Sequence, residues 1–527
     1  MSPFKTLCSI IILFVALGLL SVVFREKGIS FFNVTLRFPT LSDMFPKAED
    51  NPTEKAEDPE IAIQRMLEET RQREFSVYAD SLHFYESFFK KGATRFDLPN
   101  NDPTWFDRFF LHLELASLEE KVVHIIHYGD SQIEEDRISG TIREELQEVF
   151  GGSGPGMLPP ILEVPSMTTS HWNSGDLERF ILFGPKEQEA THNRYGPLAQ
   201  LANLNGSASI HIKKRPNREK QFPHVGEYSQ IRVLTSANSQ ISISLSYDST
   251  YIENEGDPEK EKKKKRSVMA PNPKVENFEK LRVYQWLLPQ PTDVARLNLS
   301  GSGEIYGISL DGNHGVALDN VPMRGSSGTI FHRIDKDLLQ ESYDALNARL
   351  IIMEYGGNLV PGTHKGNVEW TKKIITRQIQ TIQKVNPNAD ILFIGPADMA
   401  KQINGQLQTY PGLSLVIKAL REVCEENGVA YWDMHRVMGG NGSMQKWVKR
   451  TPALGHTDYI HFTRQGASHI GNLFSSSLKT YYDFFKFRDA HKIDDDKLND
   501  IRAFADSLKT KTPDSTIKSS MTIQGEQ

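Results

Sequence analysis

The stretch HIIHYGDSQIEED, from His124 to Asp136, decides how this chain folds. It starts within an apolar run, which predicts a buried β-strand. A small turn, Gly129-Asp130-Ser131, follows, and the acidic residues after it predict the start of a helix. A strand, a tight turn and a helix in this order are typical of one unit of an α/β sheet.

The same alternation of strand and helix recurs toward the C-terminus. Apolar segments that predict strands lie at 304–312, 348–357, 389–396 and 428–434. Amphipathic segments that predict helices lie at 134–150, 370–385, 412–427 and 464–485. Apolar strands that alternate with amphipathic helices predict a parallel sheet covered on both faces.

The segment 161–304 follows a different pattern. SQISISLSY, Ser239–Tyr247, alternates strictly between polar and apolar residues, and similar period-two stretches are broken by Gly, Pro, Asn and Asp. This pattern predicts an antiparallel β-sandwich inserted into the α/β domain. The basic run EKEKKKKR, Glu259–Arg266, lies inside the insert, and we interpret it as a solvated loop rather than a ligand-binding patch.

The overall composition excludes some classes of function. The chain has 527 residues, a formal net charge of −6, 38% hydrophobic residues and 24% charged residues. This mildly acidic balance gives no reason to expect a nucleic-acid partner. There are two cysteines, and Cys8 lies in an apolar run, so we expect no disulfide with Cys424. No cluster with metal-ligand spacing is recognised, and we expect neither a metal nor another cofactor.

The N-terminal segment contains an apolar run of 18 residues, Leu7–Phe24, with basic residues on both sides. A membrane-spanning helix needs roughly 17–25 such residues, so we expect an uncleaved signal anchor, with a cleaved signal peptide as the alternative. The bulk of the chain would then face the periplasm or the cell exterior. The predicted divisions are a signal anchor at 1–24, a tether at 25–57, a helical lead-in at 58–120 and a polar, disordered tail at 486–527.

Ser131 is a candidate nucleophile because it follows the carboxyl end of a sheet strand. Open α/β sheets bind ligands at that edge. The backbone N–H groups at the start of a helix also suit a developing oxyanion. The alternative is that Ser131 only caps the helix, and the tripeptide taken alone favours the cap.

A nucleophilic serine needs a base, and the segment HTDYIHF provides a candidate before the last helix. Asp458 and His461 are three residues apart, so the carboxylate can orient the imidazole and fix its tautomer. Asn358 follows the strand 348–357, and its amide can donate to an oxyanion. The alternatives are that Asp458 and His461 cap the last helix and that Asn358 belongs to a turn.

These blocks, in this order, resemble the SGNH (GDSL-type) hydrolase family. Gly129-Asp130-Ser131 matches the nucleophile block, Asn358 the oxyanion asparagine, and Asp458-x-x-His461 the terminal block. The resemblance covers 121–160 and 305–485 and implies a flavodoxin-like three-layer α/β/α domain. The family's oxyanion glycine would lie in PMRGSSGT, as Gly325 or Gly328, and we prefer Gly325. One departure is Gln132, because many lipase-like members have leucine after the serine.

The surroundings of the first block resemble peptidoglycan O-acetylesterases, which also carry a carbohydrate-binding-module-like insert. This resemblance implies a serine esterase that removes O-acetyl groups from a cell-envelope glycan through an acetyl-serine. Ser131 would be the nucleophile, His461 the base and Asp458 its orienter, with Ser131, Gly325 and Asn358 forming the oxyanion hole. The alternatives are an O-acetyltransferase, working with a membrane-bound O-acyltransferase partner, and a non-catalytic glycan-binding protein.

Overall fold

The computed structural model describes residues 59–215, 221–253 and 262–511, two short strands, and four single positions near the N-terminus. The strands are β1 (Ile29–Phe31) and β2 (Val34–Leu36), and they pair with each other. The expected signal anchor and tether otherwise lie outside the described residues. Among the helices that are described, none is both long enough and apolar enough to cross a bilayer.

The chain divides into two compact units. One comprises Met1–Tyr78 and Phe504–Gln527, and the other Ala79–Ala503. The first unit contains the N-terminal part of α3 (Pro59–Lys91) and the end of α12 (Asp495–Lys511). The second unit holds every candidate site residue.

A six-stranded sheet forms the centre of the α/β domain. Its spatial order is β14 (Gly315–Pro322), β4 (Val122–Gly129), β15 (Ala348–Glu354), β16 (Asp390–Ile394), β19 (Ala430–Trp432) and β3 (Phe96–Asp97). All neighbours are parallel except β3, which is antiparallel to β19. Numbered along the chain, the parallel strands run 2-1-3-4-5. This flavodoxin-like order places a topological switch point between β4 and β15, where such sheets bind ligands.

Helices cover both faces of this sheet. Residues of β15 alternate between two cores: Ile351 and Met353 enter one, Leu350 and Ile352 the other. The first core includes α6 (Lys336–Leu346), α7 (Val368–Val385) and α8 (Leu413–Glu426). The second includes α4 (Asp107–Leu118), α5 (Ser139–Phe150) and α11 (Arg464–Ala490). Burial on both faces explains why the centre of the strand, Leu350–Met353, is continuously apolar, and the predicted three-layer α/β/α class is confirmed.

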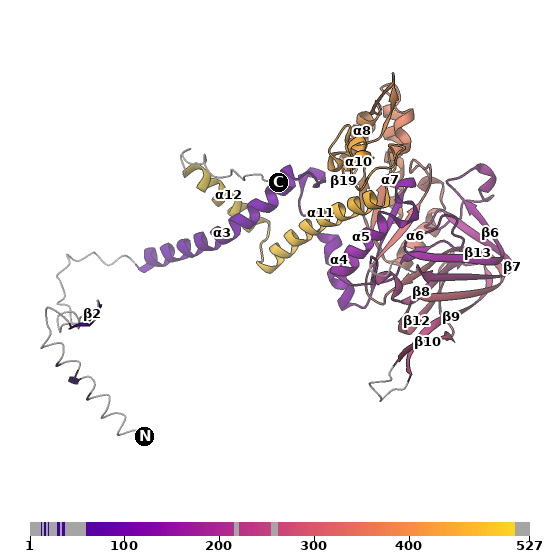
Figure 1. Ribbon diagram of the computed structural model, residues 1–527, viewed down its shortest axis with the longest axis horizontal. Helices are drawn as coiled ribbons and strands as arrows, with labels where there is room; N and C mark the ends of the chain where they lie inside the picture. The colour runs from indigo at the N-terminus through magenta and orange to yellow at the C-terminus, as the bar shows by residue number, and fades with distance from the viewer. Residues whose placement is uncertain are drawn as a thin grey trace. The chain divides into compact units, whose positions relative to one another are not determined.

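The antiparallel strands of the insert gather at one side of the unit (Figure 1). They are β5 (Gly156–Leu158), β6 (Thr169–Ile181), β7 (Gln200–Lys214), β8 (Tyr228–Ser236), β9 (Gln240–Glu253), β10 (Lys262–Met269), β11 (Lys274–Asn277), β12 (Leu281–Thr292) and β13 (Val294–Asp311). The first part of β13 pairs with β7 and β9, and the part after a register shift at Ile305 pairs with β8 and β5. Apolar residues of β7, β8, β9, β12 and β13 share one core. The sheet therefore folds across β13 into a sandwich.

The segment 304–312, expected as a strand of the parallel sheet, is instead the end of β13. The antiparallel strands thus extend from Gly156 to Asp311, beyond the expected 161–304. The second parallel strand is β14, which was not expected because Asp319 and Asn320 interrupt its apolar pattern. Asp319 is buried without an energetic conflict because it accepts hydrogen bonds from His124 Nδ1, at 2.8 Å, and the Met157 N–H, at 2.7 Å.

The prediction of one helix over 134–150 is wrong at its start. Ser131–Asp136 form a kinked 3-10 helix, η2, and the α-helix α5 begins only at Ser139. The cap of η2 is Asp130, whose Oδ1 accepts a hydrogen bond from the Gln132 N–H at 3.0 Å. Ser131 is therefore not a helix cap, and no α-helix starts directly after it.

Two terminal segments also differ from expectation. The lead-in at 58–120 contributes the edge strand β3 as well as helices. The tail was expected to be disordered after about residue 487, yet α11 continues to Ala490 and α12 follows. The buried residues Ile493, Leu498 and Ile501 explain why this segment is ordered. The sequence did not predict it because three apolar residues are too few to give a periodic signal.

Candidate active site

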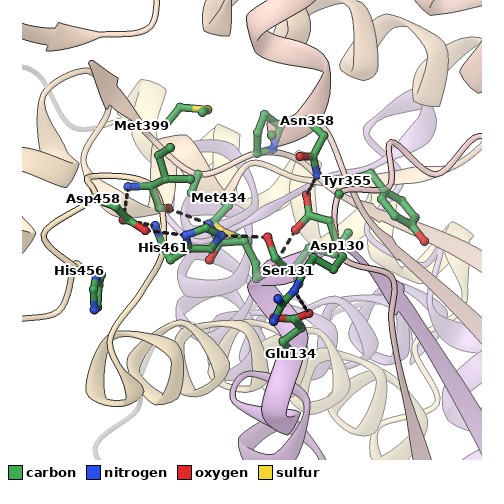
Figure 2. Close-up of a pocket in the computed structure, with 18 of the residues that line it drawn as sticks. Asp130, Ser131, Glu134, Tyr355, Asn358, Met399, Met434, His456, Asp458 and His461 are labelled. Carbon is green, nitrogen blue, oxygen red and sulfur yellow. Dashed lines mark hydrogen bonds and ion pairs between the residues drawn. The ribbon is translucent and has the colours of Figure 1, made fainter. Parts of the chain in front are cut away.

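The structure brings Ser131, His461 and Asp458 into one chain of hydrogen bonds (Figure 2). Ser131 Oγ lies 2.8 Å from His461 Nε2, and His461 Nδ1 lies 2.7 Å from Asp458 Oδ2. A carboxylate only accepts hydrogen bonds, so Nδ1 carries the proton and Nε2 presents a lone pair to the serine hydroxyl. This arrangement lets the imidazole take the Ser131 proton as a general base.

Asp458 also shapes the loop that carries His461. Its Oδ1 accepts hydrogen bonds from the Ile460 N–H at 2.9 Å and the His461 N–H at 3.0 Å. Partial burial by itself raises the pKa of Asp458, but the hydrogen bonds from the His461 side chain, the His461 N–H and the Ile460 N–H outweigh it and lower the pKa below the ordinary value. Asp458 is therefore a stable anion beside the imidazole at neutral pH.

Asn358 lies on the 3-10 turn η6 (Gly357–Gly362), directly beyond the carboxyl end of β15. Its Nδ2 donates to Asp130 Oδ2 at 3.0 Å and to the Ser326 carbonyl oxygen at 3.0 Å. Both amide hydrogens thus have acceptors in this structure. An oxyanion that forms beside Ser131 would share or replace one of these two acceptors.

The loop after β14 contains both candidate oxyanion glycines. Gly325 borders the pocket at φ +74°, and nothing lies within 4 Å of the position that a Cβ would occupy. Its N–H has no acceptor in the described part of the chain. Gly328 is buried away from the pocket, and its N–H donates to Ser326 Oγ at 3.1 Å. The geometry therefore favours Gly325 over Gly328.

A cavity of about 580 Å³ lies at the carboxyl ends of the strands and contains all five predicted site residues. Further wall residues come from the segment after β16, from η2 and the residue after it, and from the loop after β14. They include Gly395, Pro396, Ala397, Met399, Tyr410, Glu134, Glu135, Arg137 and Arg324. Arg324 closes one side through a bidentate ion pair with Glu134, at 2.6 and 2.8 Å. The cavity coincides with the switch point between β4 and β15.

Sequence reasoning missed the role of Asp130. Burial raises its pKa to about 7, and the neighbouring Glu354 and Glu134 add to this effect, while hydrogen bonds from the Gln132 N–H and Asn358 oppose it. Asp130 therefore changes charge near neutral pH while it holds the Asn358 amide. Its position directly before Ser131 was the only signal in the sequence.

Glu354 was also missed, although it ends an apolar strand at the same sheet edge as Ser131. It is buried, and its Oε2 lies 3.0 Å from His127 Nε2. On the other side of this ring, His127 Nδ1 lies 3.1 Å from Ser139 Oγ, whose hydroxyl proton goes to Asn320 at 2.9 Å. This chain of bonds joins Glu354 through the His127 ring to Ser139 and Asn320.

Within the described ranges, no group of three or more His, Cys, Asp and Glu side chains is placed to hold a metal ion. The reactive groups that the structure brings together at this edge are a serine hydroxyl, an imidazole and a carboxylate. Such a set can perform acyl transfer from an ester through a serine.

No protein-family model matches the sequence, and no curated protein gives a significant match. Among solved structures, a peptidoglycan O-acetylesterase superposes with a TM-score of 0.53 at 16% identity, over 73% of this chain and 96% of that chain. An acetyl xylan esterase, AlAXEase, gives a TM-score of 0.25 at 16% identity, over 31% and 81%. A family two carbohydrate esterase from Cellvibrio japonicus gives 0.23 at 11% identity, over 60% and 99%. The chain thus shares the fold of the peptidoglycan O-acetylesterase and resembles the SGNH (GDSL-type) hydrolases.

Proposed function

We propose that this protein is a serine carbohydrate esterase that removes O-acetyl groups from a cell-envelope glycan, specifically peptidoglycan. The observation that carries the proposal is the hydrogen-bonded chain Asp458–His461–Ser131 at the edge of the cavity. The fold shared with a peptidoglycan O-acetylesterase supports the class of substrate.

In the proposed reaction, His461 Nε2 takes the Ser131 hydroxyl proton while Oγ attacks the acetyl carbonyl carbon. The N–H groups of Ser131 and Gly325 and the amide of Asn358 stabilise the oxyanion of the tetrahedral intermediate. His461 then gives its proton to the sugar oxygen, and the C–O ester bond breaks to leave acetyl-Ser131. Water, deprotonated by His461, attacks this ester and releases acetate, and the proton returns to Ser131.

Solvent access to the catalytic residues favours hydrolysis over acetyl transfer. The side chains of His461 and Asp458 are 34% and 40% exposed, so water can reach an acetyl group on Ser131. A transferase must exclude water from its acyl-enzyme to protect it from hydrolysis. In the alternative, a sugar hydroxyl would accept the acetyl group, and a membrane-bound O-acyltransferase would supply it.

The location of the protein is part of the proposal. The apolar run Leu7–Phe24 would anchor the chain in a membrane, with the catalytic unit facing the periplasm or the cell exterior. An O-acetylated envelope glycan would be accessible on that side.

Incubation of the purified protein with a soluble acetyl donor and an unacetylated glycan separates the two reactions. An esterase releases free acetate at a rate that does not depend on the glycan. A transferase instead produces O-acetylated glycan, detected by mass spectrometry, and that outcome would replace the hydrolytic proposal.

A further inference from the structure

Gln132 and Arg137 line the cavity, but neither takes part in the proposed reaction. Gln132 directly follows the nucleophile, and Arg137 lies one turn further along the chain. Both side chains reach from the Ser131 turn to the loop that carries His461.

The two side chains bind the backbone on either side of His461. Gln132 Nε2 donates to the Ile460 carbonyl oxygen at 2.8 Å, and Arg137 NH1 donates to the Phe462 carbonyl oxygen at 3.3 Å. Ile460 and Phe462 are the immediate neighbours of His461. The base is therefore held from both sides by donors that come from the nucleophile's own turn.

Arg137 is also bound to the nucleophile's backbone. Its NH2 donates to the Ser131 carbonyl oxygen at 2.7 Å, and its Nε donates to the Glu134 carbonyl oxygen at 3.0 Å. No carboxylate lies within 4.0 Å of the guanidinium among the described residues. The guanidinium thus serves as a rigid fork of donors that joins two segments, rather than as one half of an ion pair.

Few other polar contacts join these two segments. In the part of the chain that the structure describes, three hydrogen bonds connect residues 131–137 with residues 455–464. They are Ser131 to His461, Gln132 to Ile460 and Arg137 to Phe462. A partly exposed ion pair between Arg464 and Glu135, at 3.8 Å, is the only further polar link there. Asp458 organises the His461 loop internally but does not bind the Ser131 turn.

The backbone of the turn brings Arg137 back toward Ser131. Glu135 and Asp136 have φ values of +60° and +63°, a conformation that residues other than glycine rarely adopt. The carboxylate of Asp136 is held by both terminal nitrogens of Arg143, at 2.7 and 2.9 Å. The surrounding structure therefore maintains an unfavourable turn. This turn brings the Arg137 guanidinium to the Ser131 carbonyl oxygen.

We propose that Gln132 and Arg137 are positioning residues that form a two-point clamp on the His461 backbone. The clamp keeps His461 Nε2 within hydrogen-bonding distance of Ser131 Oγ. This inference rests on the proposed function, in which Ser131 is the nucleophile. It also gives a reason for glutamine after the serine, because glutamine, unlike leucine, can donate to the Ile460 carbonyl oxygen.

The test measures the reactivity of Ser131 without the natural substrate. A fluorophosphonate probe labels activated serines, and its second-order rate constant is compared for the wild type, Gln132→Met, Arg137→Met and Arg137→Lys. Methionine keeps the length of glutamine and the aliphatic part of arginine without their donors, and lysine keeps the charge of arginine without the fork. We expect the rate constant to fall about 10-fold for Gln132→Met and about 100-fold for both Arg137 variants. With an aryl acetate, kcat should fall by similar factors and KM should change less than about twofold.

A matched control removes a similar bond elsewhere. Gln445 Nε2 donates to the Leu407 carbonyl oxygen at 2.9 Å, and Gln445 does not line the cavity. Gln445→Met should leave the labelling rate unchanged, and melting temperatures show whether all variants are folded.

The outcomes separate the clamp from the proposed function. Equal labelling of the wild type and the Gln132 and Arg137 variants would overturn the clamp while leaving Ser131 as nucleophile. An equal loss of labelling in Gln445→Met would also overturn it, since the effect would then be general destabilisation. A folded wild type that is neither labelled nor active on an aryl acetate would instead refute the proposed function.

Discussion

Ser131 and His461 are 330 positions apart in the chain, yet Ser131 Oγ lies 2.8 Å from His461 Nε2. Ser131 follows the carboxyl end of β4, and His461 lies just before α11. The parallel sheet brings these two segments to the same edge, where an acyl-transfer mechanism needs a nucleophile and a base in contact.

Asp458→Asn should lower kcat by roughly 10³–10⁴-fold with little change in KM. The two backbone N–H groups that bind Oδ1 would keep the amide oxygen on their side, so the amide NH2 would face His461 Nδ1. The imidazole would then carry its proton on Nε2 and could not accept one from Ser131. Steady-state kinetics with an aryl acetate measure the loss. A variant that keeps more than about a tenth of wild-type kcat would contradict the assigned tautomer.

Asn358→Ala should lower kcat by about 10²–10³-fold, the usual effect of removing one oxyanion donor. The control is Asn367→Ala, because Asn367 lies on the following loop and does not line the cavity, and its Nδ2 donates to the Gly362 carbonyl oxygen. That variant should retain wild-type kcat. If Asn358→Ala also retained it, the oxyanion hole would have to be built without this amide.

The elements and site residues that could be predicted are those identified by a short stretch of neighbouring residues. The strands β4, β15, β16 and β19 are mostly apolar because helices cover both faces of the sheet, so their residues alone identify them. Asp458 and His461 are close in sequence as well as in space, which made their pairing predictable. Ser131 and Asn358 each follow such a strand, and the sheet edge then brings them together.

The remainder depends on contacts between distant segments. The strand β14 contains Asp319, which is stable there only because His124 and the Met157 N–H bind it. The turn η2 has two non-glycine residues at positive φ, which local propensity disfavours and tertiary hydrogen bonds stabilise. Neither the partners nor their geometry could be inferred from the neighbouring sequence.

Asp130→Asn should change how the free energy of unfolding depends on pH. Burial raises the pKa of Asp130 to about 7, above its ordinary value in the unfolded chain. The folded state therefore binds the proton more tightly, and the stability from this group is present at low pH and lost as pH rises through about 7. The difference in the free energy of unfolding between the variant and the wild type should change by up to about 1.4 kcal/mol per pH unit between pH 4.5 and 7. Urea unfolding at several pH values measures this, and parallel curves would contradict the raised pKa.

Arg232→Met should destabilise the junction between the antiparallel insert and the α/β domain. Arg232 NH2 donates to Asp311 at 3.0 Å and lies 2.6 Å from His124 Nε2, and its NH1 donates to the Ala345 carbonyl oxygen at 2.8 Å. Burial alone would raise the pKa of Asp311, but His124, Arg232 and Ser309 lower it to about 2. Asp311 is therefore a buried anion, and Arg232→Met would remove one of its partners. We expect a loss of about 3–5 kcal/mol in the free energy of unfolding.

The control for Arg232 is Arg296→Met, which removes a partly exposed ion pair with Asp248 in the same antiparallel sheet. Such pairs contribute about 1 kcal/mol or less. Denaturant unfolding measures the free energy of unfolding of both variants. Similar losses would mean that the buried contacts of Arg232 stabilise the protein no more than a partly exposed ion pair.

The central claim is that Ser131 deacetylates an envelope glycan, and acetate release from O-acetylated peptidoglycan tests it most directly. Wild-type protein and Ser131→Ala are incubated with the same wall preparation, and free acetate is measured over time. We expect acetate release by the wild type and a rate at least about 10³-fold lower for Ser131→Ala. Equal release by both proteins, or no release by folded wild-type protein, would contradict the account.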